Sequence, residues 1–378
     1  MTTAGRLVAV VLPPNEGFSP EAAGAISLII QRLGTAPSAF RTTVLGSPLR
    51  YPPFPEPSFQ PVRAPIWLPG SRGSRYAWAV TRALRRLAPE LIEVHNRPRL
   101  ALHLAERFPG TPVALFLHND PQGMRGMASP AQRASLRYLA RVLVVSPYVR
   151  DRLMDGVQGR WAAAPVVVPN PVDLAATPAP LPPEQREHLI LFAGRLVPEK
   201  GASTFVAACA QALPSLPGWR AEVIGARRLR PGADRDGYAA GVRQAAQAAG
   251  VHASGHQPHG AVLHAMSRAA IVAVPSVWPE PFGLTALEAM AGGAVLVCSA
   301  QGNLPALVGD AAVLVPPGDA AALAAALMAL AEDAPRRAAL GRAGVARAAG
   351  FDVTIAAEAL DRVRAGILGL QSFEPPAG

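Results

Sequence analysis

The sequence has little cysteine, lysine or charge, and these shortages exclude several classes of protein. Its two cysteines, Cys209 and Cys298, cannot build a disulfide framework and form no C-x-x-C pair, so a reducing compartment is expected. No run reaches the ~18–20 uninterrupted apolar residues of a membrane-spanning helix. No G-x-G-x-x-G follows an apolar run, which argues against a dinucleotide oxidoreductase. Half of the 378 residues are apolar, so the chain is not disordered.

Lysine occurs once, at Lys200, beside 35 arginines, and the excess positive charge is confined to the first half of the chain. Residues 1–170 carry 20 arginines and nine acidic residues, whereas residues 171–378 carry 16 basic and 17 acidic residues. This imbalance predicts an anionic partner for the first half: a phosphorylated acceptor, an anionic membrane surface or nucleic acid. Arginines that only keep an alanine-rich domain soluble are the alternative.

Short runs rich in Val, Ile and Leu alternate with segments of helical period. Continuous apolar runs are typical of strands buried on both faces of a parallel sheet. The expected strands are 6–12, 90–95, 111–117, 141–146, 165–169, 188–193, 220–225, 270–275, 293–298 and 311–316. The helical patterns include 19–34, 98–107, 147–155, 202–213, 237–249, 260–269, 284–292, 319–331 and 335–349. This α/β alternation predicts two Rossmann-like domains with parallel sheets that face an interdomain cleft, where ligands are expected.

Two proline-rich segments interrupt the alternation. We interpret residues 46–71 as a long surface loop and residues 171–187 as the linker between an N-terminal domain, 1–170, and a C-terminal domain, 188–350. The apolar run near the start of the chain is too short for a signal-peptide core and is predicted to be the first strand. These features lead us to expect a cytoplasmic protein.

Two segments of the second half carry residues suited to a nucleotide diphosphate. In LILFAGRLVPEKG, Arg195 and Lys200 lie between a strand end and a helix start, where two cations suit a diphosphate; pairing with Glu199 is the alternative. In VPSVWPEPFGLTALEAMAGG, Glu280 lies in a turn and Glu288 inside an apolar helix. A carboxylate at position 288 needs a partner, either ribose hydroxyls or a nearby arginine.

Together these segments resemble the signature of retaining family 4 glycosyltransferases of the GT-B fold. GRLVPEKG is followed about 80 residues later by PEPFGLTALEAMAGG, and the spacing of Glu280 and Glu288 is similar to the family's two-glutamate motif. The resemblance extends to VVSPYVRDRL (144–153), VVVPNPVD (166–173) and GNLPALVGDAAVLVPPGD (302–319).

The resemblance implies a set of roles for the donor. Arg195 and Lys200 would hold the donor diphosphate, Glu288 the ribose, and Glu280 would act beside the donor sugar as a catalytic residue. Further contacts to the sugar or phosphate are implied for Phe282, Gly283, Leu284 and Thr285. The donor would be a nucleotide diphosphate sugar, with a UDP-sugar favoured over a GDP-sugar, and neither metal nor cofactor would be needed.

The resemblance also implies roles in the first half. His118, in FLHNDPQG, aligns with a histidine near the donor sugar that assists by hydrogen bonding; capping of the strand end is the alternative. Gly17 stands alone after Glu16 where the family usually has a glycine pair, yet it would keep the backbone contact to the donor phosphate. The segment VHNRPR resembles a subgroup that makes bacterial surface saccharides. Its candidate acceptor contacts are His95, Asn96 and Arg97.

The implied function is transfer of a hexose-type sugar to a saccharide or lipid-linked acceptor in bacterial surface polysaccharide or lipopolysaccharide biosynthesis. This acceptor is expected to be anionic. The acceptor would be bound by domain 1–170, which could also contact the inner face of the cytoplasmic membrane, and residues 351–378 would cross back to that domain as a helix. No nucleic acid is expected as partner. The alternatives are a nucleotide-sugar epimerase or phosphorylase on the same fold, and a non-enzymatic basic protein that binds membrane or nucleic acid.

Two further patterns invite a metal interpretation. Four histidines lie at positions 252, 256, 259 and 264, but no cysteine or carboxylate joins them, so a zinc site is not expected. In the family this stretch resembles the loop that contacts the nucleotide base. Asp234 and Asp236 form an Asp-x-Asp pattern, but they follow a basic loop rather than a buried strand. A chance occurrence is therefore favoured over a metal site.

Overall fold

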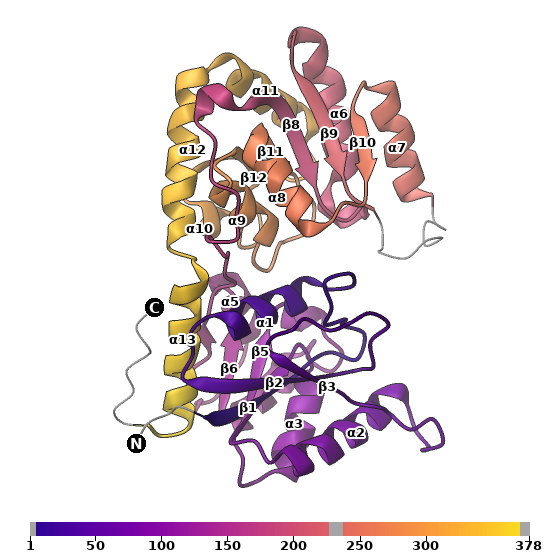
Figure 1. Ribbon diagram of the computed structural model, residues 1–378, viewed down its shortest axis with the longest axis vertical. Helices are drawn as coiled ribbons and strands as arrows, with labels where there is room; N and C mark the ends of the chain where they lie inside the picture. Colours follow the sequence, from indigo (N-terminus) through magenta and orange to yellow (C-terminus); the bar gives the residue numbers. More distant parts are fainter. Residues whose placement is uncertain (1–4, 227–236, 371–378) are drawn as a thin grey trace. The chain divides into compact units, whose positions relative to one another are not determined.

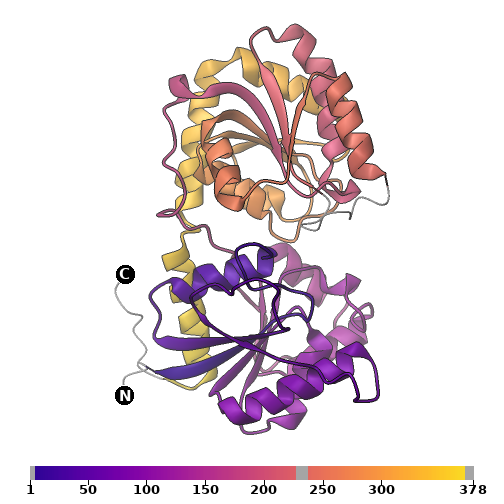
Figure 2. The same ribbon diagram turned by 45° about the vertical axis from the view of Figure 1, so that its right-hand side comes forward.

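The computed structural model describes residues 5–226 and 237–370, and Asp234 and Asp236 lie outside these ranges. The chain divides into two compact units, Met1–Pro171 with Val353–Gly378, and Val172–Asp352. Each unit contains one parallel β-sheet with helices on both of its faces (Figures 1 and 2). The expected α/β architecture with parallel sheets is confirmed in both units.

The sheet of the first unit has the strand order β3-β2-β1-β4-β5-β6-β7. Its strands are β1 (Arg6–Val11), β2 (Phe40–Gly46), β3 (Ser58–Pro61), β4 (Leu91–His95), β5 (Val113–Leu117), β6 (Arg141–Val144) and β7 (Val166–Val167). Its helices are α1 (Ala25–Thr35), α2 (Arg72–Leu87), α3 (Pro98–Arg107), α4 (Pro130–Ala134), α5 (Pro147–Met154) and α13 (Val353–Ile367). Every residue of the central strands β4 and β5 is buried, as their continuous apolar runs predict.

The sheet of the second unit has the order β10-β9-β8-β11-β12-β13. Its strands are β8 (Glu187–Ala193), β9 (Arg220–Ile224), β10 (His252–Gly255), β11 (Ala269–Val274), β12 (Val295–Ser299) and β13 (Ala312–Val315). Its helices are α6 (Ala202–Ala212), α7 (Tyr238–Ala248), α8 (His259–Arg268), α9 (Leu284–Ala291), α10 (Leu304–Val308), α11 (Ala320–Glu332) and α12 (Ala334–Ala349). In both units, functional side chains are expected beyond the carboxyl ends of these parallel strands.

The prediction of a long surface loop over residues 46–71 is wrong in part. This segment contains β3, which pairs in parallel with β2 from Thr43↔Ser58 to Gly46↔Pro61. Strands β2, β3 and β10 and helix α2 were not predicted. The edge strands β3 and β10 contain no buried residue, and an edge strand tolerates proline because one side of it needs no ladder hydrogen bonds.

Helix α13 packs against α1 within the first unit. It is fixed there by a buried ion pair, in which Nε and Nη2 of Arg364 lie 2.8 and 2.9 Å from the two carboxylate oxygens of Glu93 in β4. On the same helix, Asp361 accepts a hydrogen bond of 2.8 Å from the backbone N–H of Ala39. None of the helices within residues 5–226 and 237–370 has the length and apolar character to cross a membrane.

Candidate active site

An ion pair in the second unit joins two segments that lie 80 residues apart. Lys200 Nζ is 2.6 Å from Glu280 Oε1, and Ser276 Oγ donates to the same oxygen at 2.5 Å. Lys200 follows β8 and Glu280 follows the neighbouring strand β11, which pair in the sheet (Figure 1). Glu280 is buried and Lys200 partly exposed, so the carboxylate is anchored while the ammonium retains donors for a ligand.

Glycines make this approach of the two segments possible. Gly201 has φ +70°, and a Cβ on it would lie 1.8 Å from the carbonyl oxygen of Pro275. Gly225 follows β9, and a Cβ there would lie 1.9 Å from the carbonyl oxygen of Gly194. Arg195, next to Gly194, is exposed and forms no ion pair with a described residue. The loop therefore presents two cations from a rigid backbone.

The segment around Glu280 is held by a turn that sequence analysis quoted without assigning a role. A Cβ on Gly302 would lie 2.4 Å from the backbone nitrogen of Glu280. The Asn303 N–H donates to the Glu280 carbonyl at 2.8 Å, and its Nδ2 donates to the Phe282 carbonyl at 3.0 Å. Ser276, Gly302 and Asn303 are therefore positioning residues that the prediction missed.

Gly283 is the N-cap residue before α9 and has φ +103°, and it has no side chain to cap the first turn. The backbone N–H groups near Leu284 and Thr285 therefore lie at an uncapped helix N-terminus, which favours an anion. The Phe282 side chain is buried and makes an edge contact with Phe351 at 6.1 Å between ring centroids. A donor contact from Phe282 would therefore involve its backbone.

Glu288 is buried in α9, and its Oε1 lies 2.9 Å from Nε2 of His259 at the start of α8. The predicted partner of Glu288 is ribose or an arginine, and His259 is predicted as one of four histidines in a loop near the base. The contact brings that loop to Glu288. His259 is half-exposed, so this pair can face a ligand.

Two buried histidines of the first unit are in direct contact. His95 Nδ1 lies 2.8 Å from His118 Nε2, at the carboxyl ends of β4 and β5. Burial lowers the pKa of His95 to about 3, and burial together with the charge of His95 lowers the pKa of His118 well below its ordinary value. Both rings are therefore neutral at pH 7, which suits hydrogen bonding rather than acid catalysis.

The neutral pair has a fixed balance of donors and acceptors. Two neutral imidazoles carry two N–H groups, and one of them lies in the His95–His118 contact. Of the two remaining ring nitrogens, His95 Nε2 and His118 Nδ1, one is a donor and the other an acceptor. The side chain of Asn170 interacts with His118 and raises its pKa, which is the smallest of the three effects on this pKa. The pair therefore responds as one unit to any group that binds to either end.

The other predicted acceptor residues lie beside this pair. Asn96 has φ +51°, and its Oδ1 accepts from the backbone N–H of His118 at 2.7 Å. This bond and the His95–His118 ring contact both join the ends of β4 and β5. Arg97 is exposed and begins α3, and its charge acts on the nearby carboxyl of Glu16.

Glu16, the acidic neighbour of Gly17, is directed into α1. Its Oε1 accepts from the backbone N–H of Ser27 at 3.2 Å, in the first turn of that helix. Burial raises the pKa of Glu16 despite this bond. Gly17 bridges to Ala23, and a Cβ on Gly17 would lie 2.7 Å from the carbonyl oxygen of Ala22. The carboxylate therefore caps a helix.

Comparison with known proteins gives two consecutive matches. Residues 36–176 match the family described as Glycosyltransferase Family 4, and residues 176–347 match the one described as Glycosyl transferases group 1. The chain carries a family 4-like and a group 1 glycosyltransferase domain. The group 1 match lies in the second unit and contains Arg195, Lys200, Glu280 and Glu288.

Two curated relatives are named as a glycosyltransferase and a glycogen synthase. A D-inositol 3-phosphate glycosyltransferase of Segniliparus rotundus is 34% identical over 193 residues, which are 50% of this chain and 42% of that protein. A glycogen synthase of Mycobacterium tuberculosis is 29% identical over 277 residues, 68% of this chain and 64% of that protein. The chain thus matches less than two thirds of the length of these relatives.

Solved structures match nearly the whole chain. A sucrose-phosphate synthase of Thermosynechococcus elongatus has a TM-score of 0.77 at 22% identity, covering 96% of this chain and 100% of that one. Anabaena HepE, in complex with UDP and glucose, has a TM-score of 0.74 at 20% identity, covering 94% and 99%. These matches confirm the GT-B fold of two Rossmann-like domains.

Among the described residues of the second unit, no three or more His, Cys, Asp or Glu side chains form a group that could hold a metal ion, and this applies to the histidines at 252, 256, 259 and 264. Cys209 and Cys298 are buried, and burial raises the pKa of each thiol to about 12. Neither thiol is therefore a ready nucleophile.

The buried histidine pair of the family 4-like domain predicts acid sensitivity. Below pH 6.5 the unfolded chain binds protons that folded His95, with a pKa of about 3, does not bind, so stability falls as the pH falls through this window. Each such histidine costs about 1.4 kcal/mol per pH unit. We expect the free energy of unfolding, measured with urea, to be lower at pH 5.5 than at pH 7. This decrease should be smaller in His95→Phe than in the wild type. The exposed control His264→Gln should keep the wild-type drop; an equal drop in His95→Phe would contradict the prediction.

Proposed function

We propose that the protein is a retaining glycosyltransferase that moves a hexose-type sugar from a nucleotide diphosphate sugar to a saccharide or lipid-linked acceptor. The observation that carries this proposal is the Lys200–Glu280 pair in the group 1 domain, with Ser276 on the same carboxylate oxygen. The relative HepE, solved with UDP-glucose, supports a nucleotide-sugar donor.

On the donor side, Lys200 and the exposed Arg195 would bind the diphosphate together with the N-terminus of α9. Glu288, with His259 beside it, would accept hydrogen bonds from the ribose hydroxyls. These cations and N–H groups would offset the charge on the leaving nucleotide, and we propose that they do so without a metal. UDP is the favoured nucleotide.

On the acceptor side, the family 4-like domain would supply His95, Asn96 and Arg97, while the backbone of Gly17 would contact the donor phosphate. The neutral His118 would act by hydrogen bonding. The sugar C1–O bond to the diphosphate breaks, the acceptor hydroxyl oxygen bonds to C1 on the same face, and its proton passes to the departing phosphate oxygen. This step needs no side chain as a nucleophile and preserves the anomeric configuration.

We place the reaction in the assembly of bacterial surface polysaccharide or lipopolysaccharide, at the cytoplasmic face of the membrane. The VHNRPR segment and the basic first half support this role. A nucleotide-sugar epimerase or a phosphorylase is the alternative on the same fold. Product analysis with and without acceptor separates them, because only a transferase requires an acceptor to release the nucleotide diphosphate and a new glycoside.

Nucleotide binding is tested by thermal stability with UDP, GDP, ADP and their glucose conjugates. A ligand at 100 times its Kd adds about 2.7 kcal/mol of stability, and we expect UDP to give the largest shift in melting temperature. Glu288→Gln should lose most of this shift, because an amide replaces the carboxylate that accepts the ribose hydroxyls. Glu199→Gln, in the exposed part of the Lys200 loop, is the control and should keep it. A folded protein that no nucleotide stabilises would refute the donor site.

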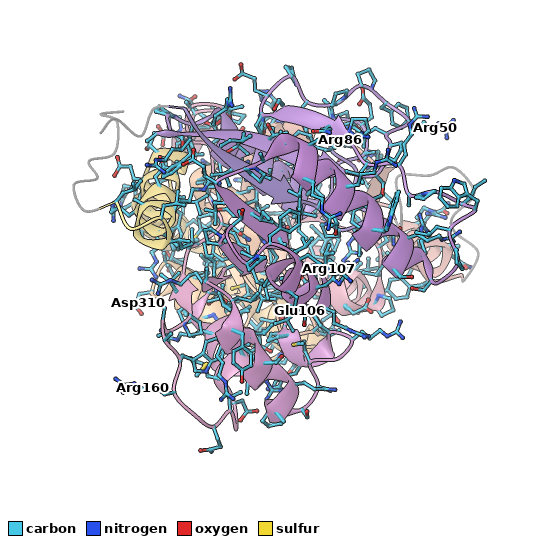
Figure 3. All side chains as sticks on the ribbon, turned by 90° about the horizontal axis from the view of Figure 1, so that it is seen from below. Arg50, Arg86, Glu106, Arg107, Arg160 and Asp310 are labelled. Carbon is cyan, nitrogen blue, oxygen red and sulfur yellow. The ribbon has the colours of Figure 1, made fainter. Side chains whose placement is uncertain are left out.

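A specific surface of the family 4-like domain supports membrane contact. Ile66 and Trp67 are 88% and 75% exposed, and the Trp67 and Trp78 rings meet edge to face at 6.5 Å. Arg82 lies over the Trp78 ring, and Arg75 donates to the Ile66 carbonyl at 2.9 Å. Arg86, on the same helix α2, is labelled in Figure 3, which shows this unit from below. Indole rings beside arginines suit the interface of an anionic bilayer.

We therefore expect the protein to bind phosphatidylglycerol vesicles and to bind phosphatidylcholine vesicles at least tenfold more weakly, because each arginine near an anionic surface contributes about 1 kcal/mol. The double variant Ile66→Ala/Trp67→Ala should lose most of this binding in vesicle sedimentation. Tyr138→Ala, which removes another exposed aromatic ring of the same unit, is the matched control. Binding that is equal for both lipids, or unchanged in the double variant, would refute this surface.

A further inference from the structure

The second unit contains a cavity of about 860 Å³ that the donor site does not use. Its walls include Arg186 and His188 at the start of β8, Val295 at the start of β12, and Ala338 and Val345 on α12. Lys200 and Glu280 instead follow the carboxyl ends of β8 and β11. The cavity therefore lies at the opposite edge of the same sheet, and its volume is within the range of small-molecule sites.

Three arginines line this cavity. Arg186, Arg337 and Arg342 line it together with His188, and Glu184 is the acidic residue of its lining. Arg186 donates from Nη1 to the Ala269 carbonyl at 3.1 Å and from Nη2 to the Gly292 carbonyl at 2.7 Å. Carbonyl oxygens orient the guanidinium without neutralising it.

The charge of Arg186 is not compensated within the described parts of the unit. It forms no ion pair there, and burial alone lowers its pKa to about 10. Burial also lowers the pKa of Arg337, against the opposing effect of the nearby Asp333. Partly buried guanidinium groups in such surroundings favour an anion that can share their N–H groups.

We propose that this cavity binds a small organic phosphate whose remaining part is apolar. The apolar walls from β11, β12 and α12 would receive the body of the ligand, and the guanidinium groups would bind its phosphate oxygens. An inorganic anion would leave the apolar walls unused, whereas an uncharged apolar compound would leave Arg186 without a counter-charge.

The cavity is joined by one hydrogen bond to the helix that carries Glu288. Arg186 Nη2 binds the carbonyl of Gly292 directly after α9, and Glu288 lies within that helix. A ligand that binds to the Arg186 guanidinium therefore affects the hydrogen bond at the end of α9. This link to the donor site rests on the proposed function, whereas the binding site itself does not.

The test measures binding of phenyl phosphate, inorganic phosphate and phenol to the full chain by titration calorimetry. We expect phenyl phosphate to bind saturably, and the other two at least roughly tenfold more weakly, because each offers half of the required contacts. Arg342→Ala should weaken phenyl phosphate binding roughly tenfold, the loss of one charge-assisted contact. Arg336→Ala, which removes an exposed arginine of α12 outside the cavity lining, should leave it unchanged.

Further arms separate this proposal from the donor site and from a folding defect. Ala338→Phe fills the cavity without removing a charge and should abolish phenyl phosphate binding while the thermal shift by UDP remains. Glu288→Gln, or saturation with UDP, should leave phenyl phosphate bound. Any one of four results would overturn the proposal. These results are no saturable binding of phenyl phosphate, equally tight binding of inorganic phosphate, loss of phenyl phosphate binding in Arg336→Ala, and competition of UDP with phenyl phosphate. If UDP fails to bind and phenyl phosphate binds, the proposed function fails and this site stands.

Discussion

Replacement of Lys200 by methionine is expected to lower kcat/KM for sugar transfer by about 10²–10³-fold, as removal of one preorganised electrostatic contact does in other enzymes. Lys200, in the turn between β8 and α6, supplies the ammonium that lies 2.6 Å from Glu280 Oε1. In the proposed reaction this ammonium offsets the charge that develops on the leaving diphosphate. Steady-state kinetics with saturating acceptor measure the effect, and Lys200→Arg, which keeps the charge without its compact shape, should recover only part of the activity.

The same substitution has a second effect, because it leaves the buried Glu280 carboxylate with Ser276 and without its cation. We expect Lys200→Met to lower the free energy of unfolding by about 1–3 kcal/mol as well. The double variant Lys200→Met/Glu280→Gln removes the uncompensated charge and should regain stability. It should not regain activity. Recovery of activity in the double variant would mean that Lys200 only neutralises Glu280 and does not act on the donor.

The interior of the fold could be predicted because its strands have a plain physical signature. All six residues of β11 are apolar and buried, and such runs between helical patterns lead directly to parallel sheets. The edges could not be predicted in this way. Strand β10 has no buried residue. Strand β3 contains Pro61, which is tolerated because one side of an edge strand forms no ladder hydrogen bonds. Helix α2 carries five arginines, yet its buried residues Tyr76, Val80 and Leu84 follow the helical period, so that signal was present in the sequence.

The sequence predicted which segments form the candidate site, but it did not predict the side-chain contacts between these segments. The sequence placed Lys200 after one predicted strand and Glu280 after another, without their order in the sheet. Their ion pair depends on Gly201, which lies too close to Pro275 for any side chain. The contact between His259 and Glu288 depends on how α8 packs beside α9, for which local spacing gives no signal. The individual roles of these residues in the reaction remain predictions.

Arg364→Met is expected to cost about 3–5 kcal/mol of stability at pH 7, the largest effect on folding that we predict. The Arg364 and Glu93 side chains are 5% and 2% exposed, and two hydrogen bonds of 2.8 and 2.9 Å join them. Asp361, one turn earlier on α13, lies 3.5 Å from the same guanidinium. Without Arg364, two buried carboxylates would face each other with no cation, and urea unfolding followed by tryptophan fluorescence measures the loss.

The exposed pair of Arg362 and Glu358 on the same helix provides the control. Its atoms lie 3.4 Å apart at the surface, so Arg362→Met should cost at most about 0.5 kcal/mol. Burial already raises the pKa of Asp361, and removal of Arg364 would raise it further, so protonation at lower pH should relieve part of the cost. The loss in Arg364→Met should therefore be smaller at pH 5 than at pH 7, and Arg364→Met/Glu93→Gln should regain stability. A cost equal to that of Arg362→Met would show that packing of α13, rather than this ion pair, fixes the helix to the first unit.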